Sequence, residues 1–333
     1  MRLREALEQS LNSATVTLGE RIGLDRVVEQ AKVSGIESPL QPTPATLLGA
    51  SEVTVLEITA AYGTLARGGE WRRPYAINKV EDGYGQVVFE EKREVRRAAS
   101  PQAAFLVTSI LRGTVERGTA ASARRLGLTR EAAGKTGTSN GMRDAWFVGY
   151  TPDLIAGVWV GIDSGAPLRR TGAQAALPIW TQFIEQASAR YPPRSFQSPP
   201  GIVTTKIDPV SGLRLTPDCE GGVEEGIHSG DRTHSKLSGG RVCAPPVVPS
   251  SLFPLILQKR GYPNWDSLPP KSGGQGGATV GDIVHFWLRW RVTYRKYSEG
   301  SFVAMAVRFG IPYAWNSGVV TIELVIPVMG RRQ

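Results

Sequence analysis

Three strand candidates follow one another closely in the middle of this chain. The first, residues 133–139, is rich in glycine and threonine, and the second, 145–150, is aromatic and β-branched. The third, 154–162, is apolar at successive positions, which is typical of a central strand that is buried on both faces. The joins Asn140-Gly141 and Thr151-Pro152-Asp153 are turn-like, so the sequence predicts an antiparallel meander.

Helical patterns lie on both sides of this meander. The segments with helical apolar spacing or helix-end residues are 2–9, 24–34, 51–67, a segment opening at Pro101, and 177–189, which we expect to begin at Pro178. A hairpin is predicted for 75–80 with 86–89, because a glycine-rich turn joins two β-branched runs. Helices at both ends of an antiparallel sheet predict an α+β fold.

Charge and composition change along the chain. The 333 residues carry a net charge of +9, yet residues 246–333 alone hold 10 basic against 4 acidic residues and four of the eight tryptophans. We therefore expect unlike regions, with boundaries at 1–190, 191–248 and 249–333. The sequence has no run of 18 apolar residues, the length that would predict a membrane span, and no basic-then-apolar leader follows Met1.

The most distinctive chemistry is the run Lys135-Thr136-Gly137-Thr138 in the first strand candidate. Thr136 and Thr138 would point to one face of a strand, and Gly137 leaves room for a substrate to approach. Two hydroxyls beside an ammonium suit a carboxylate, and on an edge strand the Thr138 amide would donate to an oxyanion. By itself the run also fits an ordinary strand end with a glycine bulge.

The continuation from Asp144 to Tyr150, Asp-Ala-Trp-Phe-Val-Gly-Tyr, resembles the penicillin-binding proteins, specifically the transpeptidase domain of the bifunctional (class A) peptidoglycan synthases. Upstream, Ser10-Leu11-Asn12 looks like the second motif of that family, Ser-x-Asn. Further similarity lies around 49–69 and 178–180. The resemblance covers residues 1 to about 190 and implies the penicillin-binding, β-lactamase-like transpeptidase fold, in which helices flank an antiparallel sheet.

The resemblance implies serine acyl transfer on the D-Ala-D-Ala end of peptidoglycan stem peptides, with β-lactams as mimics of that end. In the family's roles Ser10 relays protons, and Lys135 supports Ser10. Asn12, Thr136, Gly137 and Thr138 bind the substrate. No cofactor or metal is expected, and the three histidines (His228, His234 and His285) have no ligand spacing.

One motif of the family is missing from the sequence. The nucleophile belongs to Ser-x-x-Lys, and no lysine of this chain has serine three residues before it. We expect a domain that is truncated at its N-terminus and inactive by itself. A truncated gene, a fragmentary assembly and an internal start codon are all compatible with this, and so is a split protein completed by a partner chain. A non-catalytic pseudo-enzyme is the competing class.

The resemblance also bears on location, partners and cysteines. It implies the extracytoplasmic face of the membrane (the periplasm), with other cell-wall synthesis proteins as candidate partners. Cys219 and Cys243 resemble a pair that follows the transpeptidase domain in many relatives, and we expect a disulfide between them, with two free thiols as the alternative.

The tail beyond residue 249 matches no family that we recognise. Its alternation of basic and aromatic residues at 285–297 allows three readings: out-of-frame or degenerate sequence, an accessory β-module, or a nucleic-acid binder. We expect no nucleic acid among the partners, because the region that resembles the family carries little of the net charge.

Overall fold

The computed structural model describes residues 2–209, 212–215, 222–229, 307–312 and 319–325. These residues fall into two compact units, which we treat separately. The larger holds residues 2–204, 226–229 and the two strands after residue 306, and the smaller holds the described residues between 205 and 225. All the predicted site residues before residue 200 belong to the larger unit.

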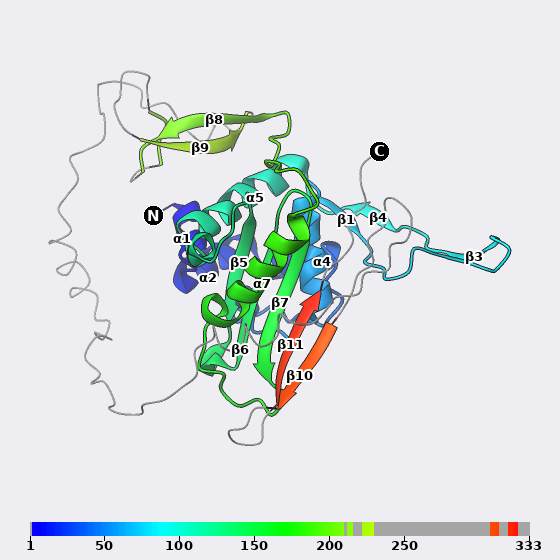
Figure 1. Cartoon of the computed structure of the whole chain (residues 1–333). Helices are drawn as coiled ribbons and strands as arrows, with labels where there is room; N and C mark the ends of the chain where they lie inside the picture. Colours follow the sequence, from blue (N-terminus) through cyan, green and yellow to red (C-terminus); the bar gives the residue numbers. More distant parts are fainter. Residues whose placement is uncertain (1, 210–211, 216–221, 230–306, 313–318, 326–333) are drawn as a thin grey trace. The chain divides into compact units, whose positions relative to one another are not determined.

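The larger unit is built on a five-stranded sheet with helices on both faces (Figure 1). Its strands, in spatial order, are β10 (Val307–Pro312), β11 (Val319–Val325), β7 (Ile155–Ile162), β6 (Asp144–Tyr150) and β5 (Ala133–Thr138). β5, β6 and β7 pair antiparallel in sequence order, so the predicted meander is confirmed. β5 forms one edge of this sheet.

Five of the seven α-helices among the described residues fall on predicted segments, whereas the helices at residues 12–22 and 122–125 were not predicted. The helices are α1 (Leu3–Glu8), α2 (Asn12–Ile22), α3 (Leu24–Val33), α4 (Val55–Ala66), α5 (Pro101–Glu116), α6 (Ser122–Arg125) and α7 (Gly172–Ser188), with 3-10 turns η1 (Thr46–Leu48) and η2 (Asn140–Met142). The paired short strands are β1 (Glu70–Arg72) with β4 (Val95–Arg97), β2 (Lys79–Glu81) with β3 (Val87–Glu90), and β8 (Ile202–Ile207) with β9 (Val223–His228). The hairpin predicted near residues 75–89 is thus confirmed.

Side-chain caps explain where two of these helices begin. The Ser100 hydroxyl accepts the Ala103 N–H at 3.1 Å, and Pro101 follows as the first helical residue of α5, as predicted. At α4, Thr54 and Glu57 form a reciprocal capping box. These caps satisfy amide groups that a helix leaves free at its first turn.

The start of α7 is a correction to the sequence prediction. The helix begins at Gly172, six residues before Pro178, because Thr171 and Gln174 form a capping box in which the Thr171 N–H donates to Gln174 Oε1 at 3.0 Å. Pro178 lies inside the helix, where it has no backbone N–H to donate. This earlier start brings the first turn of α7 to the end of β5.

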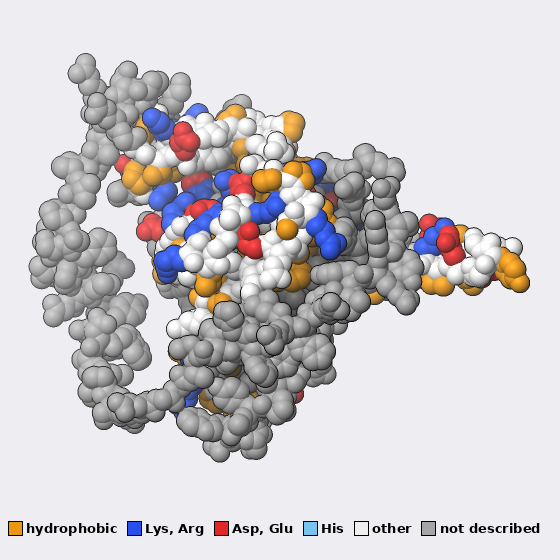
Figure 2. Space-filling model, in the orientation of Figure 1, with side chains coloured by type: hydrophobic (Ala, Val, Ile, Leu, Met, Phe, Trp, Pro, Cys, Tyr) orange, Lys and Arg blue, Asp and Glu red, His pale blue; other side chains and the backbone are white. Residues whose placement is uncertain are grey.

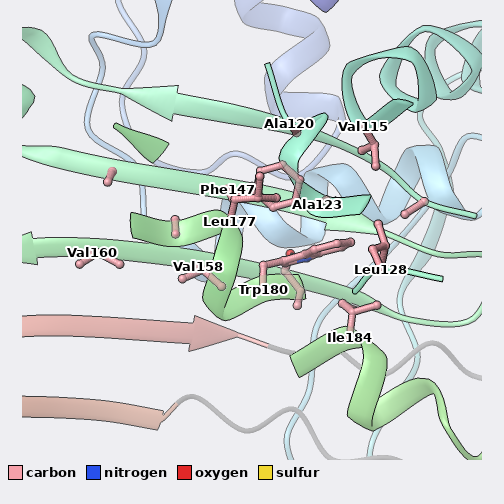
Figure 3. Packing of buried hydrophobic residues seen from close by; sticks show 14 residues of the cluster. Val115, Ala120, Ala123, Leu128, Phe147, Val158, Val160, Leu177, Trp180 and Ile184 are labelled. Atoms are coloured by element: carbon pink, nitrogen blue, oxygen red, sulfur yellow. The ribbon is translucent and has the colours of Figure 1, made fainter. Parts of the chain in front are cut away.

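A buried tryptophan anchors α7 to one face of the sheet (Figure 3). The Trp180 indole N–H donates to the carbonyls of Gly149 and Ala156, at 3.1 and 3.0 Å. Its ring meets Phe147 edge to face at 4.8 Å, and Val158 packs in the same cluster. α7 is therefore fixed to both β6 and β7.

The opposite face of the sheet packs against α4 and α5. Tyr150 and Ile155, which alternate with the residues facing α7, are fully buried there beside Leu111 of α5. The Tyr150 hydroxyl is 2.8 Å from the Thr108 hydroxyl, so its polar end has a partner. β7 is thus buried on both faces, as its apolar sequence predicted.

Two strands of the sheet come from the region beyond residue 249. β11 pairs antiparallel with β7, with Ile322 opposite Val160, and β10 pairs with β11. The sheet thus takes two of its five strands from the predicted tail, residues 249–333. Residues 249–306 and both cysteines, Cys219 and Cys243, lie outside the described residues.

Candidate active site

The centre of the candidate site is a contact between the edge strand and the turn that precedes α2. The Lys135 ammonium, on β5, donates to Ser10 Oγ at 2.8 Å and to the Thr136 carbonyl at 3.1 Å. Two of the predicted catalytic residues thus meet directly. Because the ammonium donates to Ser10 Oγ, the hydroxyl proton of Ser10 remains available for another acceptor.

Burial changes the acidity of this lysine. The surrounding protein lowers the pKa of Lys135 to about 8, since desolvation disfavours the charged form. Near neutral pH the ammonium is therefore still mostly protonated, but it gives up its proton more readily than an exposed lysine does. This is the behaviour required of a group that exchanges protons with a neighbouring hydroxyl.

Ser10 is held in place by the residue two positions before it. Glu8, at the end of α1, is buried, and Arg117 contacts both of its carboxylate oxygens, at 2.9 and 2.5 Å. The Glu8 carbonyl accepts the Thr119 N–H at 3.1 Å. Ser10 itself has φ of 57°, in the left-handed region that a serine rarely adopts, so its conformation depends on these neighbouring contacts.

Two glycines permit this close approach of α1 to the end of α5. A Cβ on Gly113 would lie 1.8 Å from Glu8 Oε1, and a Cβ on Gly118 would lie 2.4 Å from the Glu8 carbonyl oxygen. Neither position therefore has space for a larger side chain. The end of α5 is therefore tightly packed against Glu8, two residues before Ser10.

The side-chain hydroxyls of the two threonines of β5 each have a hydrogen-bond partner that the sequence did not indicate. Thr136 Oγ1 lies 2.8 Å from Thr119 Oγ1, and Thr138 Oγ1 accepts the N–H of Gly172 at 3.0 Å. Because Thr138 is the acceptor in its bond, its own proton remains free to donate. Gly172 is the first residue of α7, so the positive end of the helix dipole is also directed to this place.

Gly137 lies between these threonines without a side chain. A Cβ there would be 3.1 Å from Trp146 Cβ, which is tight contact, and a Cβ on Gly172 would be 2.5 Å from the Gly137 carbonyl oxygen. The strand and the first turn of α7 therefore approach each other through two glycines. β5 is the edge strand of the five-stranded sheet, so on one side it has no neighbouring strand among the described residues.

Asn12 is the remaining predicted residue of the site. Asn12 is exposed at the first position of α2, and no hydrogen bond joins it to Lys135 in the described part of the chain. Sequence reasoning missed Glu8, Thr119 and Gly172, which position Ser10, Thr136 and Thr138. Thr119 and Glu8 belong to no motif, whereas the Thr171–Gln174 capping signal offered a way to find Gly172.

Among the described residues, no three His, Cys, Asp or Glu side chains gather in a group that would hold a metal ion. None of the described helices is both long and apolar enough to cross a bilayer.

Known proteins match this chain across the region that contains the site. A family model described as the penicillin binding protein transpeptidase domain matches residues 1–185. Penicillin-binding protein 1A of Aquifex aeolicus is 37% identical over 221 residues, a match that covers 66% of this chain and 30% of that protein. Penicillin-binding protein 2D of Bacillus subtilis is 33% identical over 224 residues, with 65% and 32% covered.

Solved structures support the same relationship. The crystal structure of penicillin-binding protein 1A from Haemophilus influenzae aligns with a TM-score of 0.65 and 26% identity, covering 73% of this chain and 41% of that chain. The penicillin-binding protein PonA1 from Mycobacterium tuberculosis aligns with a TM-score of 0.53 and 26% identity, covering 67% and 63%. The chain spans about a third of the length of the curated relatives it matches. With its α+β fold, the chain belongs to the penicillin-binding protein transpeptidase family.

Proposed function

We propose that the described site is the proton-relay and carboxylate-binding part of a D,D-transpeptidase that cross-links peptidoglycan stem peptides. The observation that carries the proposal is the 2.8 Å contact between Lys135 Nζ and Ser10 Oγ. Family membership supplies the reaction class, which is serine acyl transfer, and the β5 edge supplies the place for the D-Ala-D-Ala terminus. The proposed setting is the extracytoplasmic face of the membrane, with other cell-wall synthesis proteins as possible partners.

Each polar group has a defined task in this proposal. A serine nucleophile attacks the penultimate D-Ala carbonyl, and the terminal D-Ala leaves as its nitrogen takes a proton. Ser10 delivers that proton and recovers one from Lys135 Nζ, and the proton that the attacking serine hydroxyl gives up restores the Lys135 ammonium, so no proton is gained or lost in the acylation step. An amine of a second stem peptide then attacks the acyl group and releases the nucleophile.

Substrate binding falls to the end of β5. The free hydroxyl protons of the Thr136–Thr119 pair and of Thr138 donate to the terminal carboxylate, beside the positive end of α7. The Thr138 amide is the proposed oxyanion donor, and Asn12 the proposed partner of the substrate backbone. β-Lactams would bind in the same place because they mimic the carboxylate-bearing terminus.

The nucleophile is not part of this sequence, since no Ser-x-x-Lys is present. We therefore expect the purified chain to bind the substrate terminus without forming an acyl bond. A fluorescent penicillin should leave no label on the chain after denaturation, and a retained label would contradict this assignment. The alternative, a pseudo-enzyme or split-protein module, is distinguished by whether the neighbouring DNA encodes Ser-x-x-Lys in the same or an adjacent gene.

Binding itself is tested with a stem peptide that ends in D-Ala-D-Ala. Titration followed by NMR should detect binding to the unmodified chain and to the Thr138→Ser variant, and about tenfold weaker binding to Thr138→Val, which loses one charge-assisted hydrogen bond. The same peptide ending in an amide is the ligand control. Equal binding by the serine and valine variants would overturn the carboxylate assignment.

A further inference from the structure

The β2–β3 hairpin belongs to the larger unit and has no role in the proposed function. It projects from the rest of that unit, and both strands are exposed along their whole length (Figure 1, Figure 2). Its large apolar side chains are exposed by 42 to 95%, and they are Val80, Tyr84, Val87, Val88 and Phe89. An isolated two-stranded hairpin is only marginally stable in water, so this exposure indicates a missing neighbour.

The two faces of the hairpin differ in chemistry. Val80 lies opposite Phe89, which gives one face an apolar pair. Lys79 lies opposite Glu90 and forms an ion pair with Glu81, so the other face is charged. A strand that pairs with this hairpin must therefore continue the apolar row on one face and the alternating charges on the other.

The two edges of the hairpin are also unequal. The pairing shifts between Val80 and Glu81, because Phe89 and Val87 face these neighbours and Val88 is left over as an extra residue on β3. A bulge of this kind disturbs an edge and protects it from further pairing. β2 carries no such interruption, so its outer edge is the one suited to another strand.

We infer that β2 pairs antiparallel with β2 of a second copy of this chain, about a twofold axis at Val80. In that register Lys79 of each copy lies opposite Glu81 of the other. The charged face then reads Glu90, Lys79, Glu81 and Val87 across the four strands, with no like charges side by side. The apolar face reads Phe89, Val80, Val80 and Phe89, a continuous row.

The charge of the hairpin favours a second copy over other occupants. Between residues 79 and 90 it carries one basic and three acidic groups, so it does not suit an anionic membrane surface or a nucleic acid. Along β2 the charge is positive at Lys79 and negative at Glu81. An antiparallel second copy therefore places opposite charges next to each other, which a symmetric contact requires.

Cysteine cross-linking of the 333-residue chain tests the register. Residues directly opposite in an antiparallel pair have Cα atoms about 4.5 to 5.5 Å apart, within reach of a disulfide. The Val80→Cys variant should therefore form a disulfide dimer at least about tenfold faster than Val88→Cys, because pairing raises the effective concentration of the two thiols. Peptide mass spectrometry identifies the linked position. Val88 is the more exposed side chain, so equal or faster linkage there would overturn the proposal.

Charge reversal in the Val80→Cys background separates contacts between copies from those within one. Lys79→Glu places glutamates opposite glutamates, and Glu81→Lys places lysines opposite lysines, so each variant alone should cross-link several-fold more slowly. A mixture of the two should regain the original rate as a heterodimer, identified by mass. The ion pair within each hairpin is absent in both variants, so rescue comes only from the contact between copies. Failure of the mixture to recover contradicts the proposed pairing.

Discussion

Lys135 Nζ and Ser10 Oγ lie 2.8 Å apart although 125 residues separate them in the sequence. The contact joins the edge of the five-stranded sheet to the turn between α1 and α2. Ser10 is positioned by Glu8, whose carboxylate is buried against Arg117. The geometry of the candidate site therefore depends on packing between α1 and α5, several residues away from the polar groups themselves.

The first prediction concerns the space between α1 and α5. A methyl group at Gly113 would collide with the Glu8 carboxylate, at 1.8 Å from Oε1. Gly113→Ala should lower the free energy of unfolding by about 1 to 3 kcal/mol, although alanine normally favours a helix. Urea denaturation measures this, with Gly83→Ala, which faces open space, as the control.

A double-mutant cycle shows whether Glu8 is the cause. In the background of Glu8→Ala, which removes the obstructing carboxylate, Gly113→Ala should cost much less than in the unmodified chain. If the two losses simply add, the collision with Glu8 is not the reason for the glycine.

The second prediction concerns Lys135 and pH. Burial lowers the pKa of Lys135 to about 8, whereas an unfolded lysine keeps the proton up to about 10.5. Between these values the unfolded state binds more protons than the folded state, so Lys135 makes the chain more stable as pH rises. Relative to Lys135→Met, the free energy of unfolding should increase by about 1 to 2 kcal/mol from pH 7.5 to pH 9.5.

The exposed Lys79 provides the control for this measurement. Its ion pair with Glu81 raises its pKa, so its effect on stability is constant over the same range and falls only at higher pH. Lys79→Met should therefore show no added pH dependence between pH 7.5 and 9.5. A matching slope for the two methionine variants would rule out the buried lysine as its origin.

The third prediction concerns Glu57 at the start of α4. Burial alone would raise its pKa, but hydrogen bonds from Thr54 and Ser38 outweigh this and lower the pKa to about 2. The stability that ionised Glu57 contributes is complete above pH 4.5 and is lost as the pH falls toward 2. The stability difference between the unmodified chain and Glu57→Gln should shrink from pH 6 to pH 3, as measured by urea denaturation. A stability difference that stays constant from pH 6 to pH 3 would rule out ionised Glu57 as its source.

Local patterns predicted most of the elements that carry the site. The strands β5, β6 and β7 were evident because turn residues separate runs of β-branched and aromatic residues. The start of α5 was evident because Ser100, which caps the helix, directly precedes Pro101, the first helical residue. Both signals are short-range, so the chain alone reveals them.

The contacts that complete the site are of another kind. Glu8 and Arg117 are 109 residues apart, and Thr119 meets Thr136 only after α5 packs on the sheet. No spacing rule connects such pairs. Similarly, β11 joins β7 although the charge and composition of residues 249–333 predicted a separate region. Pairing between distant strands depends on which edge is open, and a linear pattern does not contain that information.

The last prediction concerns the tryptophan that fixes α7. Trp180 fills the core and donates to two backbone carbonyls, one on β6 and one on β7. Trp180→Phe keeps an aromatic ring but leaves a cavity and removes the donor, so it should lower the free energy of unfolding by about 2 to 4 kcal/mol. Trp159→Phe is the matched control, because Trp159 is only half-buried and its indole N–H donates once, to Asp144 at 3.0 Å. Chemical denaturation of both variants should show the larger loss for Trp180. Equal losses would mean that α7 is held by general burial rather than by this indole.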